Sequence, residues 1–213
     1  SEEFTITVSP TAQVAQVDDI VVCNGDEVAE IEFATTSEND IAYSWSIDAE
    51  IGTQSLTGVG NIPLFEADND TNDPIVAIVT VTPSNDETDP SLTCEGSSIE
   101  FTITVNPTAQ VDLVDSLDLC NGDTAVVDFT TSNGGVDSVT TYSWEITDGD
   151  SVFVGGASGE GNINLPVINE TNADLVATVT VIPTYTNDGV DCTGPSEEFT
   201  ITVSPTAQVA QVD

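Results

Sequence analysis

Residues 99–105 read IEFTITV, and the fold can be worked out from this stretch. Glu and Thr separate its apolar residues, which are Ile99, Phe101, Ile103 and Val105. Successive side chains of an extended strand point to opposite faces, so this alternation is typical of a strand with one buried face. The sequence therefore predicts a sheet that is apolar on one side and solvated on the other.

The same stretch also reveals an internal repeat. FTITV stands at residues 4–8, 101–105 and 199–203. Three further motifs occur twice: CNGD at 23–26 and 120–123, YSW at 43–45 and 142–144, and GNI at 60–62 and 161–163. The first eighteen residues, 1–18, return unchanged as residues 196–213. We interpret the chain as two diverged copies of one domain within a unit that is itself repeated in a longer array.

These matches predict the domain boundaries. Residues 1–9 would be the closing strand of a preceding repeat, and residues 10–105 the first β-sandwich. Residues 106–203 would form the second β-sandwich, and residues 204–213 would begin a following repeat. A short Pro-containing segment stands at each joint, without a Gly/Ser linker, so we expect successive domains to stack end to end with limited bending.

Each copy is predicted to be all-β. Alternating apolar residues continue at 75–81 and 175–181, and further strands are expected at residues 30–34, 42–47, 126–130 and 141–146. Asn-Gly, Asp-Gly and Pro clusters separate these segments, and no segment keeps a helical period. Several short strands in each copy indicate tandem immunoglobulin-like β-sandwiches. Trp45 and Trp144 take equivalent positions in mid-strand, which favours core packing over a sugar-stacking surface.

The composition excludes whole classes of partner. Among 213 residues there is no Lys, Arg or His, and the 38 Asp and Glu residues give a net charge of -38. Binding of nucleic acid or anionic lipid depends on basic residues, so neither partner is expected. The usual general bases, amine nucleophiles and oxyanion clamps are missing as well, so the chain is not predicted to be an enzyme. No apolar run approaches the length of a membrane-spanning helix, so direct membrane insertion of this segment is not expected.

The cysteines number two in each copy. They are Cys23, Cys94, Cys120 and Cys192. In the simple pairing, Cys23 bonds with Cys94 and Cys120 bonds with Cys192, giving one disulfide per domain and implying an oxidising, extracellular setting. The alternative is a metal site, but the sequence has neither close Cys-x-x-Cys spacing nor His.

The acidity has three explanations. It can solvate and extend a long fibre by self-repulsion, it can be an adaptation to salt, or it can bind divalent cations. No cofactor is required by the sequence, and Ca²⁺ or diffuse divalent counterions are the candidates. The sharpest calcium cluster is Asp68, Asp70 and Asp73 within DNDTND, with Asp148 and Asp150 weaker and the acidic loop at 86–89 a further candidate.

Short motifs for glycan attachment also occur. Asn69 and Asn169 begin Asn-x-Thr triplets, which match the N-linked pattern. Four triplets that begin with Asp resemble the short O-glycosylation motif of Bacteroidota, and their hydroxyl residues are Ser116, Thr124, Ser138 and Ser151.

Taken together, these motifs resemble the PKD-like, immunoglobulin-like repeats of very large secreted surface proteins of Bacteroidota, including gliding-motility adhesins. The resemblance rests on FTITVNPT at 101–108, CNGD at 120–123, YSW at 142–144, GNI at 161–163, and the run from Asn169-Glu170-Thr171 to ATVTV at 177–181. It covers nearly the whole chain and implies domains that serve as spacers, stalks or adhesive modules. Members of the family contain some Lys, which this chain lacks.

We therefore expect a structural fibre or adhesin stalk at the cell surface. Its partners would be neighbouring repeats of the same chain and other copies in a bundle. One alternative is a polymerising subunit in which residues 4–8, or their twin 199–203, complete a neighbouring molecule by strand addition. Another is a carbohydrate- or calcium-binding adhesive module.

Overall fold

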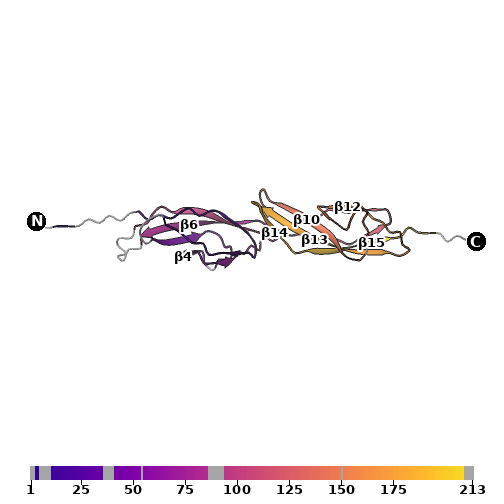
Figure 1. The fold of residues 1–213 in the computed structure, drawn as a ribbon, viewed down its shortest axis with the longest axis horizontal. Coiled ribbons are helices and arrows are strands. Elements are labelled where there is room, and N and C mark those ends of the chain that lie inside the picture. Colours follow the sequence, from indigo (N-terminus) through magenta and orange to yellow (C-terminus); the bar gives the residue numbers. More distant parts are fainter. Residues whose placement is uncertain are drawn as a thin grey trace, which may run out of the picture. The chain divides into compact units, whose positions relative to one another are not determined.

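The computed structural model describes residues 3–4, 11–35, 41–53, 55–85, 94–149 and 151–208. Over these residues the fold is all-β, with 15 strands and no helix, as the sequence predicts (Figure 1). The chain divides into two compact units, Ser1–Pro107 and Thr108–Asp213. The described part therefore contains no helix long and apolar enough to cross a membrane.

Unit 1 is a two-layer sandwich. Its larger sheet has the order β1-β7-β6-β3-β4, and β2 pairs with β5 in the second layer. The strands are β1 (Ile20–Cys23), β2 (Glu27–Val28), β3 (Ile41–Ile47), β4 (Thr57–Val59), β5 (Phe65–Glu66), β6 (Ile75–Asn85) and β7 (Ile99–Asn106). Residues 99–105 thus lie in β7, the last strand of this sandwich, between β1 and β6.

Unit 2 repeats this plan and adds one strand. The order is β11-β10-β13-β15-β8, β12 pairs with β9 in the second layer, and β14 extends the sheet from β13. Its strands are β8 (Leu117–Cys120), β9 (Thr124–Val127), β10 (Val139–Gly149), β11 (Ser158–Glu160), β12 (Ile163–Pro166), β13 (Leu175–Asn187), β14 (Val190–Thr193) and β15 (Glu197–Ser204). The β13–β14 hairpin turns at Asp188 and Gly189, which have φ of 48° and 77°, as a two-residue primed turn requires.

One pairing in each unit is parallel. Residues Ile20 to Cys23 of β1 align with Ile103 to Asn106 of β7, and Leu117 to Cys120 of β8 align with Ile201 to Ser204 of β15. The long central pairs, β3 with β6, β6 with β7, β10 with β13 and β13 with β15, are antiparallel. The first and last strands of each sandwich therefore run side by side in the same direction.

The alternating residues supply the two cores. Phe101, Ile103 and Val105 are buried in unit 1, and Phe199, Ile201 and Val203 are buried in unit 2. Ala77, Val79 and Val81 of β6 lie beside them in the same sheet of unit 1, and Trp45 and Phe65 belong to the same core. The matched residues Ala177, Val179 and Val181 belong to the core of unit 2. The buried apolar face predicted for residues 99–105 is confirmed, while Thr104 on the opposite face is also buried.

Two predicted strands are shorter than expected. Residues 42–47 and 141–146 lie within β3 and β10, but residues 30–34 contribute only the isolated bridge Ile31↔Ile62. Residues 126–130 likewise keep their ladder only as far as Val127. The cause is a side chain: Asn61 Oδ1 accepts from Phe33 N at 3.2 Å, and Asn162 Oδ1 accepts from Phe129 N at 3.0 Å. These amides replace the strand-to-strand hydrogen bonds there.

Candidate functional site

The CNGD motifs form the same tight turn in both units. Asp26 Oδ2 accepts from Cys23 N at 3.1 Å, and Asp123 Oδ2 accepts from Cys120 N at 2.8 Å. Gly25 and Gly122 have φ of 84° and 89°, the left-handed region that favours glycine. The motif is thus a backbone-stabilising turn that follows the first strand of each sandwich.

The second residue of this turn reaches across to the Asn-x-Thr triplet. Asn24 Oδ1 accepts from Asn69 N, and Asn121 Oδ1 accepts from Asn169 N, both at 2.8 Å. The Asn69 side chain then donates to Asp73 O at 3.0 Å and Val105 O at 2.7 Å, while its Oδ1 accepts from the backbone and hydroxyl of Thr71.

The same bonds recur in unit 2. Asn169 donates to Ala173 O at 2.8 Å and Val203 O at 2.6 Å, and it accepts from the backbone and hydroxyl of Thr171. Each buried asparagine therefore joins a loop to the end of the last strand and satisfies carbonyl groups that would otherwise be orphaned.

This network determines where the residues of the predicted calcium cluster lie. The residue at its centre, Asn69, turns inward, while Asp68, Asp70 and Asp73 are exposed. In the described parts of the chain, no group of three Asp, Glu or Cys residues is placed to hold a metal ion. Asp148 is exposed near the end of β10. Asp150 and the acidic loop at 86–89 lie outside the described residues.

The glycosylation motifs divide into two groups. Asn69 and Asn169 are each 2% exposed, so their amides are not accessible for N-linked modification in the folded domain. Among the O-linked candidates, Thr124 and Ser151 are exposed, and Ser138 is partly buried with its hydroxyl donating to Gly134 O. Ser116 is exposed, and its hydroxyl bonds to the Thr200 hydroxyl at 2.9 Å. The O-linked sites stay predictions.

Both tryptophans are core residues, as the sequence predicts. Trp45 is 7% exposed and Trp144 is 5% exposed. Each lies against a glycine of the adjacent edge strand, because Trp45 is opposite Gly58 and Trp144 is opposite Gly159. A methyl group on Gly58 would lie 2.2 Å from Cζ2 of the Trp45 indole, and one on Gly159 would lie 2.6 Å from Cζ2 of Trp144.

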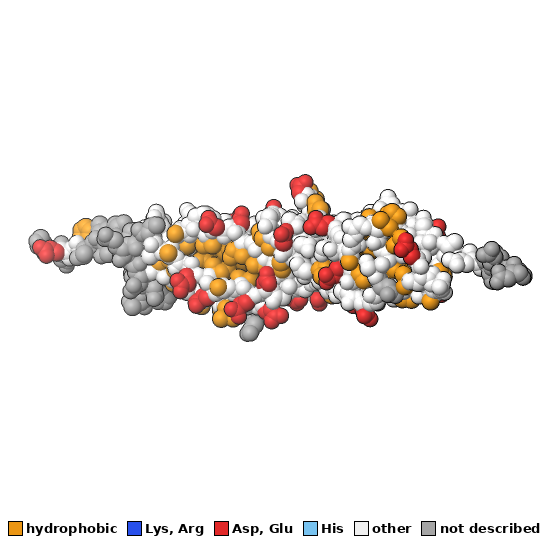
Figure 2. All heavy atoms as spheres, turned by 45° about the vertical axis from the view of Figure 1, so that its right-hand side comes forward, with side chains coloured by type: hydrophobic (Ala, Val, Ile, Leu, Met, Phe, Trp, Pro, Cys, Tyr) orange, Lys and Arg blue, Asp and Glu red, His pale blue; other side chains and the backbone are white. Residues whose placement is uncertain are grey.

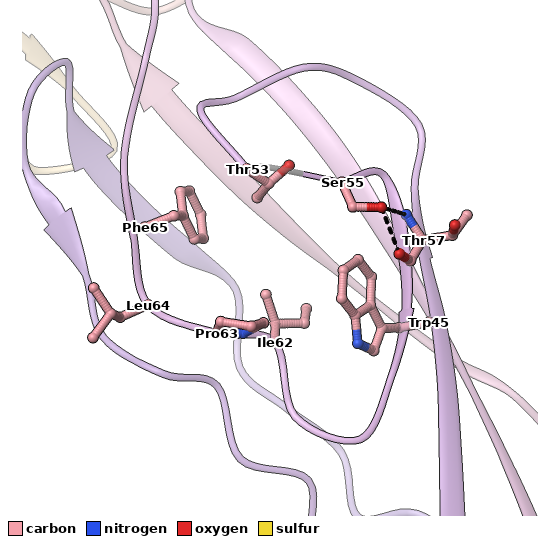
Figure 3. Close-up of a pocket in the computed structure, with 8 residues that line it drawn as sticks. All are labelled: Trp45, Thr53, Ser55, Thr57, Ile62, Pro63, Leu64 and Phe65. Carbon is pink, nitrogen blue, oxygen red and sulfur yellow. Dashed lines mark hydrogen bonds between the residues drawn. The ribbon is translucent and has the colours of Figure 1, made fainter.

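A cavity lies beside the tryptophan of each unit. The one beside Trp144 has a volume of about 430 Å³ and is lined in part by Glu145 and Glu160; the one beside Trp45 differs in its lining. The cavity beside Trp45 has a volume of about 290 Å³, and Figure 3 shows the indole edge, Ile62 and Phe65 directed toward it. Trp45 Nε1 and Thr53 Oγ1 are buried without a hydrogen-bond partner among the described residues, and so is Trp144 Nε1 in unit 2. In unit 2, Phe153 packs edge-on against Trp144 with ring centroids 5.4 Å apart. The described residues that line the cavity beside Trp45 include no Asp or Glu, so they provide no carboxylate for acid–base chemistry.

The surface carries negative charge without compensation. Red carboxylates are scattered over the face seen in Figure 2, and the sequence has no basic side chain to pair with them. Some of these carboxylates bond to the backbone: Asp19 Oδ1 accepts from Thr102 N at 2.6 Å, and Asp48 Oδ1 accepts from Ile78 N at 2.6 Å. The hydrogen bond from Thr102 N holds the pKa of Asp19 below its ordinary value. Burial, assisted by the charge of Asp112, raises the pKa of Tyr142.

The pairing of cysteines within each domain is wrong. Cys23 aligns with Asn106, next to the start of β6, whereas Cys94 O accepts from Asn85 N at the end of β6. The 11 residues of β6 lie between these points, and at about 3.3 Å per residue they separate the two cysteines by roughly 30 Å. A disulfide requires Cα atoms within about 7 Å.

Unit 2 repeats this separation. Cys120 aligns with Ser204, and Cys192 aligns with Tyr185, which lies near the far end of β13 from Leu175. Cys23 and Cys192 are both disulfide-bonded, and Cys94 and Cys120 are exposed. The in-domain pairing failed because spacing along the chain does not tell which end of a sandwich a loop occupies.

Comparison with known proteins gives only distant likenesses. No protein-family model and no curated protein matches the chain. Among solved structures, mouse cadherin-23 EC22-24 aligns with a TM-score of 0.46 and 13% identity, covering 92% of this chain and 67% of that one. The human desmocollin-1 ectodomain aligns with 0.44 and 14%, covering 93% and 42%. A three-domain titin I67-I69 variant aligns with 0.40 and 9%, covering 92% and 66%. These likenesses are too weak to assign a family or a function.

Proposed function

We propose that the chain is part of an extracellular structural fibre or adhesin stalk made of tandem acidic β-sandwich repeats. Its resemblance to the PKD-like repeats of giant Bacteroidota surface proteins supports this proposal, as does the return of residues 1–18 at 196–213. Such a protein works by its length, its resistance to unfolding and its solubility rather than by chemistry at one site.

The observation that carries the proposal is the use of the repeated motifs. Each one is taken up by folding: CNGD forms a turn, the Asn-x-Thr asparagine joins that turn to the last strand, the GNI asparagine caps the second layer, and the YSW tryptophan packs on a glycine. A domain retained for catalysis or ligand binding would share at least one set of residues without a role in the fold. Here the shared residues are the scaffold.

Location and charge fit the same role. Disulfide bonds at Cys23 and Cys192 favour an oxidising compartment such as the cell exterior. A net charge of -38 makes copies repel one another and keeps an extended array soluble. The absence of Lys and Arg from the sequence also removes every trypsin cleavage site from this segment.

The test is the mass of the native chain. Fibres or cell-surface extracts are treated with a chelator, reduced and denatured, and the intact chain is sized by gel and mass spectrometry. A chain of many repeats is expected, with a mass of many multiples of the 22.2 kDa that corresponds to this segment. A mass near one or two units would overturn the stalk and favour a polymerising subunit.

For that alternative, the strand proposed as a donor is already used in unit 2. Residues 199–203 lie in β15, paired on one side with β13 and on the other with β8. Strand exchange through this segment would require unit 2 to lose its own last strand. The twin segment at 4–8 falls outside the described residues except for Phe4, which is 84% exposed.

A second candidate function follows from the cavity beside Trp45. An apolar cavity with two unsatisfied polar atoms, Trp45 Nε1 and Thr53 Oγ1, has the character of a small-ligand site. Binding of a sugar or another small hydroxylated molecule in this cavity would change the fluorescence of Trp45. A Trp144→Phe chain isolates that signal, and a flat titration with a panel of neutral sugars would rule the module out.

A further inference from the structure

We propose that Cys120 forms a disulfide bond with Cys94 of the following copy of this repeat. The inference rests on the proposed tandem array, and it assigns to these two exposed cysteines the covalent locking of one repeat unit to the next. Each sandwich has a C-terminal pole, where its last strand ends, and an N-terminal pole, where the chain enters.

Cys120 lies at the C-terminal pole of unit 2. It is opposite Ser204, the last residue of β15, in the parallel pairing of β8 with β15. The CNGD turn holds it there, since Asp123 accepts from its backbone N–H and Asn121 N donates to Ser204 O at 2.8 Å. Asn121 Nδ2 also donates to Thr206 Oγ1 at 2.9 Å. The side chain next to Cys120 therefore holds the segment that leads out of the domain.

Cys94 lies at the N-terminal pole of unit 1. Its carbonyl accepts from Asn85 N, and two residues later Gly96 N donates to Pro83 O. Gly96 packs directly on the segment by which the chain enters, because a methyl group there would lie 1.9 Å from the Ala12 carbonyl oxygen. Ala12 is itself 1% exposed, so Cys94 is fixed beside the first residues of the domain.

The repeat in sequence brings these two poles together. Residues 204–213 read SPTAQVAQVD, identical to residues 9–18, so Ala207 takes the place of Ala12 when another copy follows. Only Pro205 and Thr206 separate Ser204, beside Cys120, from this alanine. Three residue steps span at most about 11 Å. The backbone itself thus places Cys120 of one copy near Cys94 of the next.

The other two cysteines show that a cysteine at either pole can form a disulfide bond. Cys23 is the C-terminal-pole cysteine of unit 1, and Cys192 is the N-terminal-pole cysteine of unit 2. Both are disulfide-bonded. Cysteines at these two positions are therefore used for disulfide formation in this fold, and each matched position in the other unit carries a cysteine as well.

Bond formation needs a disulfide oxidant, which a secreted chain meets as a thiol–disulfide oxidoreductase or as a small disulfide. The Cys120 thiolate attacks one sulfur of the oxidant to give a mixed disulfide, and the first thiol of the oxidant leaves. The Cys94 thiolate of the next copy then attacks the Cys120 sulfur and releases the second thiol. Two protein thiols are oxidised and one disulfide is reduced to two thiols.

The first test uses the 213-residue chain with oxidised glutathione as the oxidant and non-reducing electrophoresis as the readout. The native chain should give a ladder that dithiothreitol collapses. Cys94→Ser and Cys120→Ser chains should each remain monomeric alone, and their mixture should stop at the dimer. Cleavage after Glu and mass spectrometry should then recover a Cys94–Cys120 peptide. Dimers of either variant alone, or a Cys94–Cys94 peptide, would overturn the proposal.

If separate chains stay monomeric at accessible concentrations, a second measurement decides the question, because it makes the cross-link intramolecular. Two copies are joined in frame as residues 1–213 followed by 19–213, which preserves the natural joint because residues 196–213 and 1–18 are identical. After oxidation, alkylation should leave Cys120 of the first copy and Cys94 of the second copy unmodified, and both should react after reduction. Full alkylation of both before reduction overturns the cross-link. A native chain of many repeats with these thiols reactive would still support the stalk, so the two proposals fail separately.

Discussion

The indole of Trp45 packs on the α-carbon of Gly58 across the β3–β4 pair, with no room between them for a side chain. The same relationship joins Trp144 and Gly159 in unit 2. Glycine weakens a strand on its own, and an aromatic ring from the neighbouring strand compensates by covering its exposed backbone. The pair explains why the edge strand contains glycine at this one position in both copies.

Replacing Gly58 by Ala should therefore destabilise unit 1. The added methyl would overlap the indole ring, and relief requires the ring or the edge strand to move, at a cost of about 1–3 kcal/mol in the free energy of unfolding. Urea unfolding of unit 1 followed by the fluorescence of Trp45 in a Trp144→Phe chain measures it. The matched control is Val59→Ala, because Val59 is 82% exposed and its truncation should cost under about 0.5 kcal/mol. Equal effects of the two substitutions would contradict the packing argument.

Truncation of Asn69 to Ala should be more damaging than loss of any acid in the same loop. Its amide serves Asp73 O and the buried Val105 O, and leaving these carbonyls unsatisfied should cost about 2–4 kcal/mol. The control is Asp70→Ala, which changes the next residue of the same loop. Asp70 is exposed, so its replacement should change the stability little. Thermal unfolding reports both. If Asp70→Ala proves the worse substitution, the loop is a cation site and not a structural corner.

The hydrogen bond from Thr102 N to Asp19 predicts a specific pH dependence. Because the pKa of Asp19 is lowered in the folded state, its contribution to stability is present above its ordinary value of 3.8 and is lost as the pH falls through the lower, folded value. Asp19→Ala should thus be less stable than the native chain at pH 7, and the difference should vanish in acid. Asp18→Ala, which removes an exposed neighbouring carboxylate, should show no such convergence. A difference for Asp19→Ala that persists in acid would contradict the assignment.

Salt should stabilise both domains, because every charged side chain of the sequence has the same sign. Raising NaCl from dilute buffer to 1 M shortens the Debye length to about 3 Å. If screening recovers about 1 kcal/mol per domain, Tm rises by about 4–8 °C. CaCl₂ and MgCl₂ at equal ionic strength should act alike if the counterions are diffuse. A saturable rise with calcium alone, lost in Asp70→Asn, would instead establish the calcium site proposed from the sequence.

The sequence predicted those parts of the fold in which apolar and polar residues alternate along a strand. Alternation at 99–105 and 75–81 defined two strands of unit 1 and their buried faces, and matched positions were enough to place Trp45 and Trp144 in the cores. Strand ends were less predictable, because Asn61 and Asn162 cap backbone groups from a distance of about thirty residues along the chain. The GNI motif was visible, but nothing local indicated which backbone its amide would reach.

The candidate sites were harder to predict for a related reason. An Asn-x-Thr triplet reads the same whether it is a glycan acceptor or a buried corner, and only the contact with Asn24 and Val105 tells them apart for Asn69. The cysteine pairs were plausible from loop positions, yet they occupy opposite poles because a long strand separates them. Both the role of Asn69 and the positions of the cysteines depend on where each loop lies in the folded domain, and spacing along the chain does not encode this.

The parallel pairing of β1 with β7 has a mechanical consequence. Tension applied through the chain pulls β1 toward the N-terminal pole and β7 toward the C-terminal pole, so the hydrogen bonds between residues 20–23 and 103–106 are loaded in shear and must break together. An antiparallel pair with its free ends on one side would instead open one bond at a time, like a zipper. Force along the chain would therefore have to break the hydrogen bonds between β1 and β7 together, a property that the proposed stalk would require.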